Sequence, residues 1–427
     1  DHKFGFKTRS LHAGAVPDAA TGARAVPIYQ TTSFVFDDTK DAANLFALQK
    51  YGNIYTRIGN PTVASFEERI ASLEGGLGAV ATASGQAAEF ITFAALTGAG
   101  DHIVSSSRLY GGTVTQLDVT MRRFGVDTTF VAGSSPADYE AAIQENTKLI
   151  FVEVVSNPSS NVADLQAIAD VAHRNGIPLI VDATTVTPYL CRPIEHGADI
   201  VIHSATKFLG GHGTVVAGAI VDGGKFAWSK SDKFPGLTTP DPSYHGVNYT
   251  EALGDAIAYI IKARVQLLRD IGASIAPASA WQLIQGIETL SLRVERHVEN
   301  AEKIAHFLEK HKQVESVNYA GLKSSKWHKA AKKYAPKGAG AIVSFEIKGG
   351  VTAGARFVDS LNLFSHVANI GDVRSLVIHP ASTTHSQLTP EQQLTSGVTP
   401  GLIRLSVGLE SVDDLIADLE TAFEAAK

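Results

Sequence analysis

The sequence predicts an α/β protein: a large domain built on a mostly parallel sheet, followed by a smaller C-terminal α+β domain. Two observations predict this fold. Short apolar runs alternate with helical patterns through the middle of the chain, and long helices with well-separated strands replace that alternation after about residue 270. The length of 427 residues also favours more than one hydrophobic core. We therefore expect an N-terminal arm at residues 1–60, the large domain at 61–270 and the small domain at 271–427.

The first 60 residues are rich in turn formers and polar residues, including Pro17, Pro27 and Gly59-Asn60-Pro61, and show little periodicity. An arm is expected there. Five apolar runs then predict strands of a sheet covered on both faces. They are Gly78–Thr82, His102–Val104, Leu149–Val155, Leu179–Val181 and Ile200–Ile202.

A helix is predicted between two of these strands, over Asp164–Gly176, because its apolar residues share one helical face and a glycine ends it. In the C-terminal part, the pattern predicts a long helix over Ser291–His311 and strands over Ala341–Ile347 and Leu402–Val407. These elements fit a separate α+β domain better than a continuation of the first sheet.

The composition excludes several classes of function. A formal charge of −6 at pH 7 and the lack of a basic block argue against nucleic-acid binding or a charged membrane surface as partner. Cys191 is the single cysteine, so no intrachain disulfide can form, and no Cys/His cluster has the spacing of a metal site. No apolar run reaches the roughly 18 residues of a membrane helix. We expect a cytoplasmic protein that acts on small molecules.

Polar groups follow the predicted strands, at the sheet edge where α/β proteins bind ligands. Ser84-Gly85-Gln86 opens a helix and could present backbone N–H groups to a phosphate, although Ser84 could also be an ordinary N-cap. Tyr110 lies in a glycine-rich turn and could stack on a flat ring or simply pack. Asn157 could donate to a ring hydroxyl or initiate a turn.

Asp182 and Lys207 end neighbouring strand segments and suggest pyridoxal phosphate (PLP) as cofactor. Its aldehyde needs an amine, and its ring nitrogen needs a buried anion. A carboxylate after four apolar residues is costly to bury without a cation, which a protonated ring nitrogen supplies. The alternatives are a salt bridge from Asp182 to Arg192 and a surface position for Lys207. Ser204 and Thr206 offer hydroxyls to the phosphate.

Several stretches between Thr8 and Leu419 together match one known family. They are Tyr55-Thr56-Arg57-Ile58-Gly59-Asn60-Pro61-Thr62, Ala83-Ser84-Gly85, Tyr110-Gly111-Gly112-Thr113, Asn157-Pro158, Asp182, Ser204-Ala205-Thr206-Lys207-Phe208 and Ser375-Leu376 with His379-Pro380-Ala381-Ser382-Thr383-Thr384-His385. The chain resembles the Cys/Met-metabolism family of PLP-dependent enzymes. This resemblance implies the aspartate-aminotransferase-like fold, fold type I of the PLP-dependent transferases.

The resemblance also implies roles for individual residues. Lys207 would bind the cofactor aldehyde and shuttle protons, Asp182 would contact the ring nitrogen and Tyr110 would stack on the ring. The phosphate would lie among Ser84, Gly85, Gln86, Ser204 and Thr206, and the substrate carboxylate would be held by Arg404 and the backbone near Ser375. Tyr55 and Arg57 would reach the phosphate of a neighbouring subunit, in a homotetramer of catalytic dimers. Tyr110 or Tyr55 would assist as an acid or base.

Within the family, the chain most resembles the members with one activity, on the insertion Phe234–Gly246 and on the stretch Ser375–Gln387 followed by Gly397-Val398-Thr399-Pro400. This is a γ-replacement that converts O-acetyl-L-homoserine and sulfide to L-homocysteine and acetate. Three alternatives stay open. A cystathionine γ-synthase or a γ-lyase would use the same residues. An enzyme that uses the lysine without a cofactor would leave the phosphate site unused, and a protein that serves only as a scaffold would not need Lys207. One departure is Ala183-Thr184-Thr185-Val186, where the family more often shows Asn-Thr-Phe-Ala.

Overall fold

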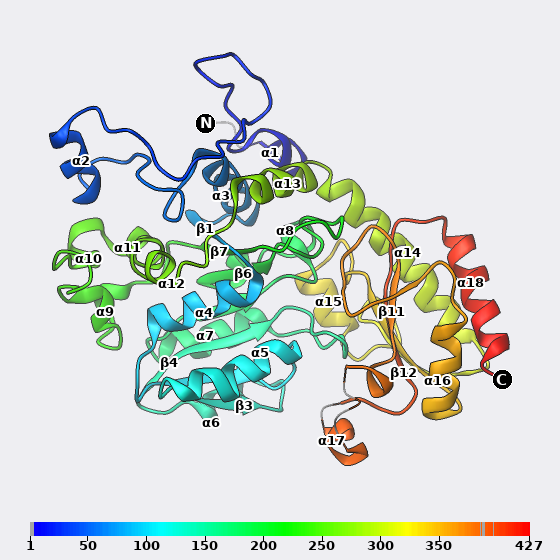
Figure 1. Cartoon of the computed structure of the whole chain (residues 1–427). Coiled ribbons are helices and arrows are strands. Elements are labelled where there is room, and N and C mark those ends of the chain that lie inside the picture. Colours follow the sequence, from blue (N-terminus) through cyan, green and yellow to red (C-terminus); the bar gives the residue numbers. More distant parts are fainter. Residues whose placement is uncertain (1–3, 385, 387–388, 396) are drawn as a thin grey trace.

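Two separate sheets form the framework of the protein in this computed structural model, which describes residues 4–384, 386, 389–395 and 397–427 (Figure 1). The first sheet has the strand order β1-β7-β6-β5-β4-β2-β3, in which β2 to β6 run parallel and β7 lies antiparallel between β1 and β6. Its strands are β1 (Gly78–Thr82), β2 (His102–Ser106), β3 (Asp127–Val131), β4 (Thr147–Glu153), β5 (Leu179–Asp182), β6 (Ile200–Ser204) and β7 (Gly218–Asp222). The predicted mostly parallel sheet is confirmed.

Both faces of this sheet are buried, as the strand β4 illustrates. Ile150 and Val152 belong to one core cluster, whereas Leu149 and Phe151 belong to the other, because successive side chains of a strand point to opposite faces. Burial of each such side chain stabilises the fold by about 1.5–3 kcal/mol. Helices α3 (Pro61–Glu74) and α7 (Leu165–Arg174) pack in the first cluster, and α4 (Gly85–Leu96) packs in the second.

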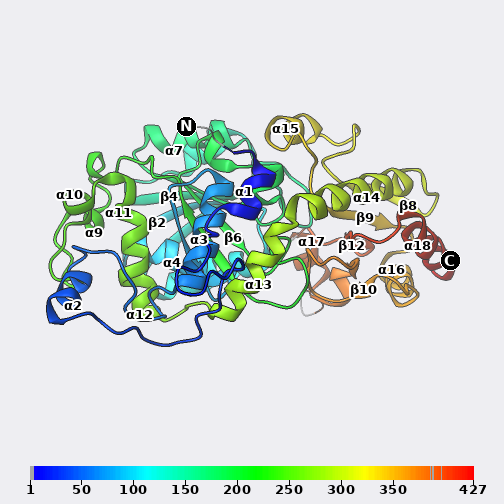
Figure 2. The ribbon, with the colours of Figure 1, turned by 90° about the horizontal axis from the view of Figure 1, so that it is seen from above.

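The chain before α3 lies largely outside this core. It contains α1 (Phe6–His12) and α2 (Thr39–Phe46), and α2 stands at the periphery of the molecule in both views (Figures 1 and 2). Other helical segments around the first sheet are α5 (Gly111–Thr115), α6 (Pro136–Ala142), α8 (Thr187–Leu190), α9 (Pro235–Thr238), α10 (Tyr249–Leu253), α11 (Asp255–Lys262) and α12 (Arg269–Ile271), with π-helical turns at Gln116–Met121 and Ala263–Leu268.

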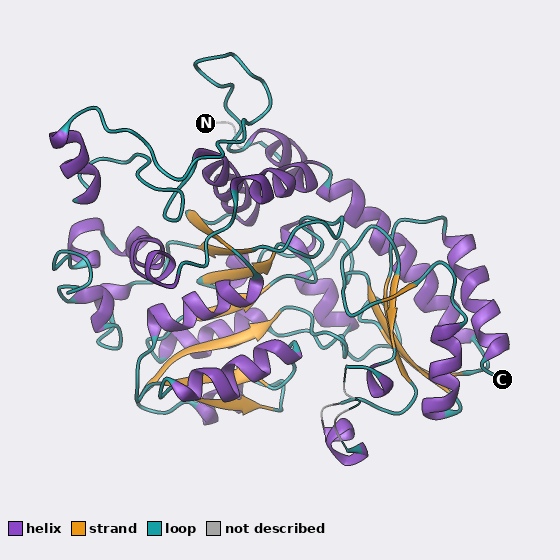
Figure 3. Ribbon diagram, in the orientation of Figure 1, coloured by secondary structure: helices purple, strands orange, loops and turns teal. Residues whose placement is uncertain are grey.

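The second sheet has the order β10-β11-β12-β9-β8 and forms a separate group of strands (Figure 3). Its strands are β8 (Val314–Asn318), β9 (Ile342–Ile347), β10 (Ser365–His366), β11 (Leu376–Ile378) and β12 (Leu402–Ser406). Helix α13 (Pro277–Glu288) packs against α3, whereas the helices of the second region include α14 (Leu290–Lys310), α15 (His328–Tyr334), α16 (Gly350–Asp359), α17 (Pro390–Thr395) and α18 (Val412–Ala425). The domain limits at residues 60 and 270 stay predictions.

The predicted elements correspond closely to the observed ones. The predicted helix over residues 164–176 is α7, and Gly176 follows its end with a left-handed φ of 66°. The predicted long helix is α14, which has 21 residues. Within the described parts of the chain, no helix has both the length and the apolar character needed to cross a membrane. His385 and Gln387, from two of the recognised stretches, lie outside the described residues.

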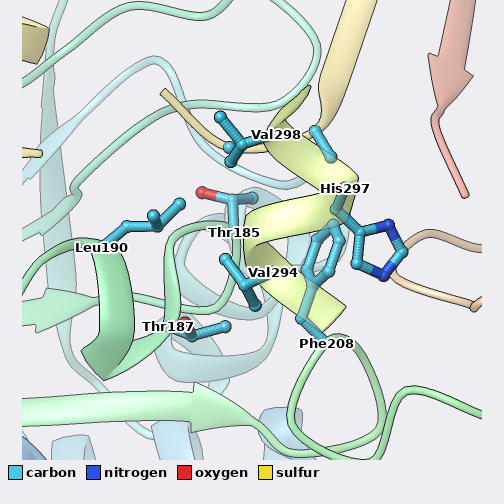
Figure 4. Close-up of a pocket in the computed structure, with 9 residues that line it drawn as sticks. Thr185, Thr187, Leu190, Phe208, Val294, His297 and Val298 are labelled. Carbon is cyan, nitrogen blue, oxygen red and sulfur yellow. The ribbon is translucent and has the colours of Figure 1, made fainter. Parts of the chain in front are cut away.

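His297 on α14 is buried where α14 meets the segment between β5 and α8 (Figure 4). Its ring packs edge-on against Phe208, with the ring centroids 5.2 Å apart, and Nδ1 lies 2.6 Å from the Val407 carbonyl oxygen. The surrounding space, lined also by Thr185 and Val298, has no room for a water molecule. Nε2 therefore has no hydrogen-bond partner. Burial, together with the charge of Arg293, lowers the pKa of His297 to about 4, against the hydrogen bond to Val407 and the charge of Asp372, which both raise it.

Acid should destabilise the protein through His297. An unfolded histidine titrates near pH 6.5, so between pH 6.5 and 4 the unfolded chain binds a proton that folded His297 does not bind. The contribution of His297 to the free energy of unfolding should therefore fall by about 3 kcal/mol as the pH drops through this window. Chemical denaturation at several pH values should show that the free energy of unfolding of His297→Asn depends less steeply on pH than that of the wild type. His306→Asn, an exposed change on the same helix, should keep the wild-type slope of unfolding free energy against pH. Equal slopes in both variants would contradict this account.

Candidate active site

A cavity of ≈ 300 Å³ lies at the carboxyl ends of β4, β5 and β6 and extends to the second sheet. Ten predicted site residues line it, although they are far apart in the sequence. They are Ser84, Gly85, Gln86, Tyr110, Asn157, Asp182, Ser204, Thr206, Lys207 and Arg404. The carboxyl ends of parallel strands meet at one edge of a sheet, which explains how the fold collects most of them.

One end of the cavity is formed by the start of α4 and the end of β6. Ser84 is the N-cap of α4, because its Oγ accepts a hydrogen bond from the Ala87 N–H at 3.0 Å. Ser84 is therefore an ordinary N-cap and also lines the cavity. A Cβ atom at Gly85 would lie 2.7 Å from the Ser204 Cβ, so glycine is required for this close approach. The positive end of the helix dipole faces an opening suited to an anion.

Asp182 lies at the end of β5 with a buried carboxyl group. Its Oδ1 accepts the Thr184 N–H at 2.8 Å, and burial raises its pKa. Arg192 forms an ion pair with Glu195 at 2.8 Å, so the alternative of a salt bridge from Arg192 to Asp182 is wrong. Among the described residues, no lysine or arginine forms an ion pair with Asp182. The carboxyl group is therefore suited to a cationic ligand.

Lys207 lies inside the cavity, which excludes the surface alternative. Its Nζ donates a hydrogen bond to the Asn369 Oδ1 at 2.6 Å. Burial, and secondarily the positive charge of Arg404, lowers the pKa of the Lys207 amine. A lowered pKa increases the fraction of neutral amine, which is the form that attacks an aldehyde.

Tyr110 and Asn157 bring an aromatic ring and an amide to the same cavity. The Tyr110 ring lies over Gly112, where an added Cβ atom would lie 2.4 Å from the Tyr110 Cε1 and the ring would have to shift. The Tyr110 residue is 55% exposed, so its ring is available to a ligand. The Asn157 Oδ1 is buried without a hydrogen-bond partner. An unpaired buried oxygen of this kind suits a ligand donor.

Arg404 enters the cavity from β12 of the second sheet. Its Nη2 donates to the backbone oxygen of Asn369 at 3.1 Å, while its buried Nε has no partner. Burial lowers the pKa of Arg404 to about 10, so the guanidinium stays charged at neutral pH. Ser375 lies elsewhere: its fully buried Oγ donates to Glu410 at 2.9 Å and accepts the Gly408 N–H at 2.8 Å. Asn369, six residues earlier, lines the cavity instead.

Tyr55 and Arg57 do not line the cavity of their own chain. Both are exposed on the segment before α3, and the Arg57 guanidinium carbon lies 5.4 Å from the centre of the Tyr55 ring. Their predicted reach into the site of a neighbouring subunit stays a prediction.

Sequence reasoning assigned no role to several residues that line the cavity. They are Glu89, Glu153, Thr184, Thr185, Val216, Ala368, Asn369 and Ile370. Two of them carried a usable signal. Glu89 lies three residues after Gln86 on α4, which is nearly one helical turn, and Glu153 ends the apolar run of β4. Asn369 carried no local signal, because it reaches the cavity from the second sheet.

The donor set fits PLP. It combines a buried amine, a buried carboxyl group without a cation, a helix start and an accessible aromatic ring. The partnerless polar atoms of Asn157, Glu89 and Arg404 remain free to meet a ligand. These features satisfy the needs of an aldehyde, a ring nitrogen and a phosphate within one cavity.

Comparison with known proteins gives the same result. The family model described as Cys/Met metabolism PLP-dependent enzyme matches residues 7–424. The O-acetyl-L-homoserine sulfhydrylase of Leptospira meyeri is 53% identical over 426 residues, covering 98% of this chain and 96% of that protein. The homocysteine synthase of Schizosaccharomyces pombe is 53% identical over 423 residues, covering 99% of this chain and 98% of that protein.

Two solved structures share the fold of the whole chain. A Campylobacter jejuni crystal structure that contains N′-pyridoxyl-lysine-5′-monophosphate has a TM-score of 0.94 at 42% identity, covering 99% of this chain and 100% of that chain. Cystathionine γ-lyase from Lactobacillus plantarum, complexed with L-serine, has a TM-score of 0.84 at 35% identity, covering 99% of both chains. The predicted fold type I is confirmed. The chain therefore belongs to the Cys/Met metabolism family of PLP-dependent enzymes.

Proposed function

We propose that the protein catalyses a γ-replacement that converts O-acetyl-L-homoserine and sulfide to L-homocysteine and acetate. The observation that carries this choice is the similarity along nearly the whole chain to sulfhydrylases and homocysteine synthases at 53% identity. The cavity supports the wider chemistry, because it brings an amine, an anion and a guanidinium group together. We also infer a homotetramer of catalytic dimers and a cytoplasmic location.

Most of the residues that would hold PLP come from the large sheet. Asp182 would bind the protonated ring nitrogen, Tyr110 would stack on the ring and Asn157 would form a hydrogen bond with the ring hydroxyl. The phosphate would lie against the start of α4 and the hydroxyl groups of Ser84, Ser204 and Thr206. In this structure the Thr206 hydroxyl donates to the Ala217 carbonyl at 3.1 Å and accepts the Ala217 N–H at 3.0 Å, so it would have to turn from the carbonyl to donate to the phosphate.

When bound, PLP supplies an aldehyde that captures amines and a ring that accepts the electron pair left at a substrate carbon. Lys207 would carry the reacting amine and, once released by the substrate, would take the proton from Cα. Arg404 would bind the substrate carboxylate, with Asn369 beside both Lys207 and Arg404. Tyr110, or Tyr55 from a neighbouring subunit, would assist as an acid or base near the leaving group.

A substrate panel tests this proposal. O-acetyl- and O-succinyl-L-homoserine should each be offered to the purified PLP-loaded enzyme with sulfide, with cysteine and with no nucleophile. Acetate and homocysteine should appear together, and only with sulfide. Preference for cysteine as the nucleophile would replace the proposal with a cystathionine γ-synthase, and release of acetate with 2-oxo acid formation but without sulfide would indicate a γ-lyase.

Replacement of Arg404 with lysine should raise the KM for O-acetyl-L-homoserine about tenfold or more, with a smaller effect on kcat. Lysine keeps the charge but loses the planar fork that binds a carboxylate through two hydrogen bonds. Steady-state kinetics measures this separation. Arg374→Lys, an exposed change just before β11, should leave both constants unchanged. Equal KM values for the two variants would exclude Arg404 as the carboxylate ligand.

The subunit arrangement is supported by the exposed segment before α3. Val35 is 100% exposed, Tyr51 75% and Phe46 47%, and this segment also carries Tyr55 and Arg57. Exposed apolar side chains on one segment favour a protein partner. Light scattering of the purified protein would give the number of subunits, and mixing inactive Lys207→Ala with inactive Arg57→Ala chains would test sharing. Restored activity would require that one chain complete the site of another.

A further inference from the structure

Glu153 is a cavity residue to which the proposed reaction assigns no role. It ends β4 and lies opposite Asp182 of β5 in the parallel register, so the two acidic side chains leave neighbouring strands at the same level. Side chains at matched positions of adjacent strands project from the same face of a sheet. Glu153 therefore lies beside the group that would bind the ring nitrogen.

The Glu153 carboxyl group binds the turn that follows β2. Its Oε1 accepts the backbone N–H of Tyr110 at 2.5 Å, and the backbone N–H of Asn157 lies near enough to lower the pKa of the carboxyl group. Tyr110 follows β2 and is the N-cap of α5, whose first turn has no side-chain cap. Asn157 follows β4 itself. The carboxyl group thus ties the Tyr110 turn to the end of β4, next to the turn that carries Asn157.

The surroundings of Glu153 determine which form of the carboxyl group fits. Its acidic neighbours are Asp182 and, across the cavity, Glu89. Within the described residues, no lysine or arginine forms an ion pair with Glu153. Burial, and then the charge of Asp182, raises the pKa of Glu153 to about 8. A neutral carboxyl group keeps an acceptor oxygen for the Tyr110 N–H and places no second negative charge beside Asp182.

We propose that Glu153 is a positioning residue, whose carboxyl oxygen fixes the Tyr110 turn against the end of β4 and so sets the orientation of the cofactor ring. This inference rests on the proposed cofactor contact of Tyr110. It assigns Glu153 no contact with the reacting atoms of the substrate. The hydrogen-bond acceptor, rather than the negative charge or the volume of the side chain, is the property that matters.

Three variants separate these properties in the PLP-loaded enzyme. Glu153→Gln keeps a neutral acceptor oxygen, Glu153→Leu keeps the volume without an acceptor, and Glu153→Asp keeps the carboxyl group but is one methylene shorter. The readouts are the induced circular dichroism of the cofactor absorption band, which reports a fixed ring orientation, and the rate of cofactor release on dilution. Thermal unfolding checks that each variant folds.

We expect Glu153→Gln to keep the circular dichroism band and to release the cofactor within about threefold of the wild-type rate. Glu153→Leu and Glu153→Asp should weaken the band and release the cofactor about tenfold faster, as expected when the Tyr110 N–H donor loses its acceptor. Glu145→Gln, an exposed change just before β4, should match the wild type.

Two results would overturn the inference. A Leu or Asp variant that matches the wild type would show that the acceptor is not needed, and a Gln variant as impaired as Leu would show that the charge itself is required. If Glu153→Leu does not fold, Glu153→Asp carries the test alone. Neither readout uses a substrate. An enzyme that binds PLP but makes no homocysteine would therefore contradict the proposed function and leave the role of Glu153 open to this test.

Discussion

Replacement of Lys207 with alanine is expected to lower kcat about 10⁴-fold or more while the protein stays folded. Proton transfer by a positioned side chain contributes roughly 10²–10⁴-fold to rate, and Lys207 would also supply the amine that holds the cofactor. The structure supports both roles, because the Lys207 amine is buried, has a lowered pKa and lies 2.6 Å from the Asn369 Oδ1. Both contributions would be lost together.

Three measurements test this expectation. Turnover should fall, the visible absorption band of lysine-bound cofactor should disappear, and the thermal unfolding temperature of the cofactor-free protein should change little. Lys230→Ala, an exposed change far from the cavity, is the matched control and should keep full activity. Added methylamine should restore part of the activity, because a free amine can replace the missing one. Wild-type turnover without Lys207 would refute the assignment and favour a scaffold.

The sequence was sufficient to predict the residues that lie at strand ends. Asp182 and Lys207 follow short apolar runs, and parallel strands bring such residues to one edge of the sheet. The alternation of apolar runs and helical patterns also predicted the strands of the first sheet, except β3 and β7. The run of β3 contains Asp127, Thr128 and Thr129, so it is less apolar than its neighbours, and β7 returns antiparallel without the helix that marks a parallel crossover.

The second half of the site was harder to predict, because it depends on how the two sheets meet. Asn369 follows β10, yet its side chain accepts a hydrogen bond from the amine of Lys207, which lies 162 residues earlier in the chain. No periodicity in the sequence encodes such a contact. Ser375, just before β11, was favoured by a recognised motif. Its hydroxyl group, however, forms hydrogen bonds with the Glu410 carboxylate and the Gly408 N–H. The role of the backbone near Ser375 in binding the substrate carboxylate stays a prediction.

Replacement of Asp182 with asparagine is expected to lower kcat about 10³-fold with little change in the fold. Asparagine has nearly the same shape, but it cannot offer a negative charge to the ring nitrogen. Two opposite charges about 4 Å apart at an effective dielectric constant of about 20 attract each other by about 4 kcal/mol, which corresponds to roughly 10³-fold in rate. The acidic groups nearby would not compensate, because burial also raises the pKa values of Glu89 and Glu153.

The comparison of three variants isolates the charge of Asp182. Asp182→Asn removes the charge, Asp182→Glu keeps it with one added methylene, and Asp170→Asn removes an exposed carboxylate from α7. The kcat of Asp170→Asn should equal that of the wild type. The kcat of Asp182→Glu should be lower, and that of Asp182→Asn should be the lowest. The cofactor should remain bound in Asp182→Asn, because Lys207 and the start of α4 are unchanged. An Asp182→Asn enzyme with wild-type kcat would mean that the buried carboxyl group serves only to accept the Thr184 N–H.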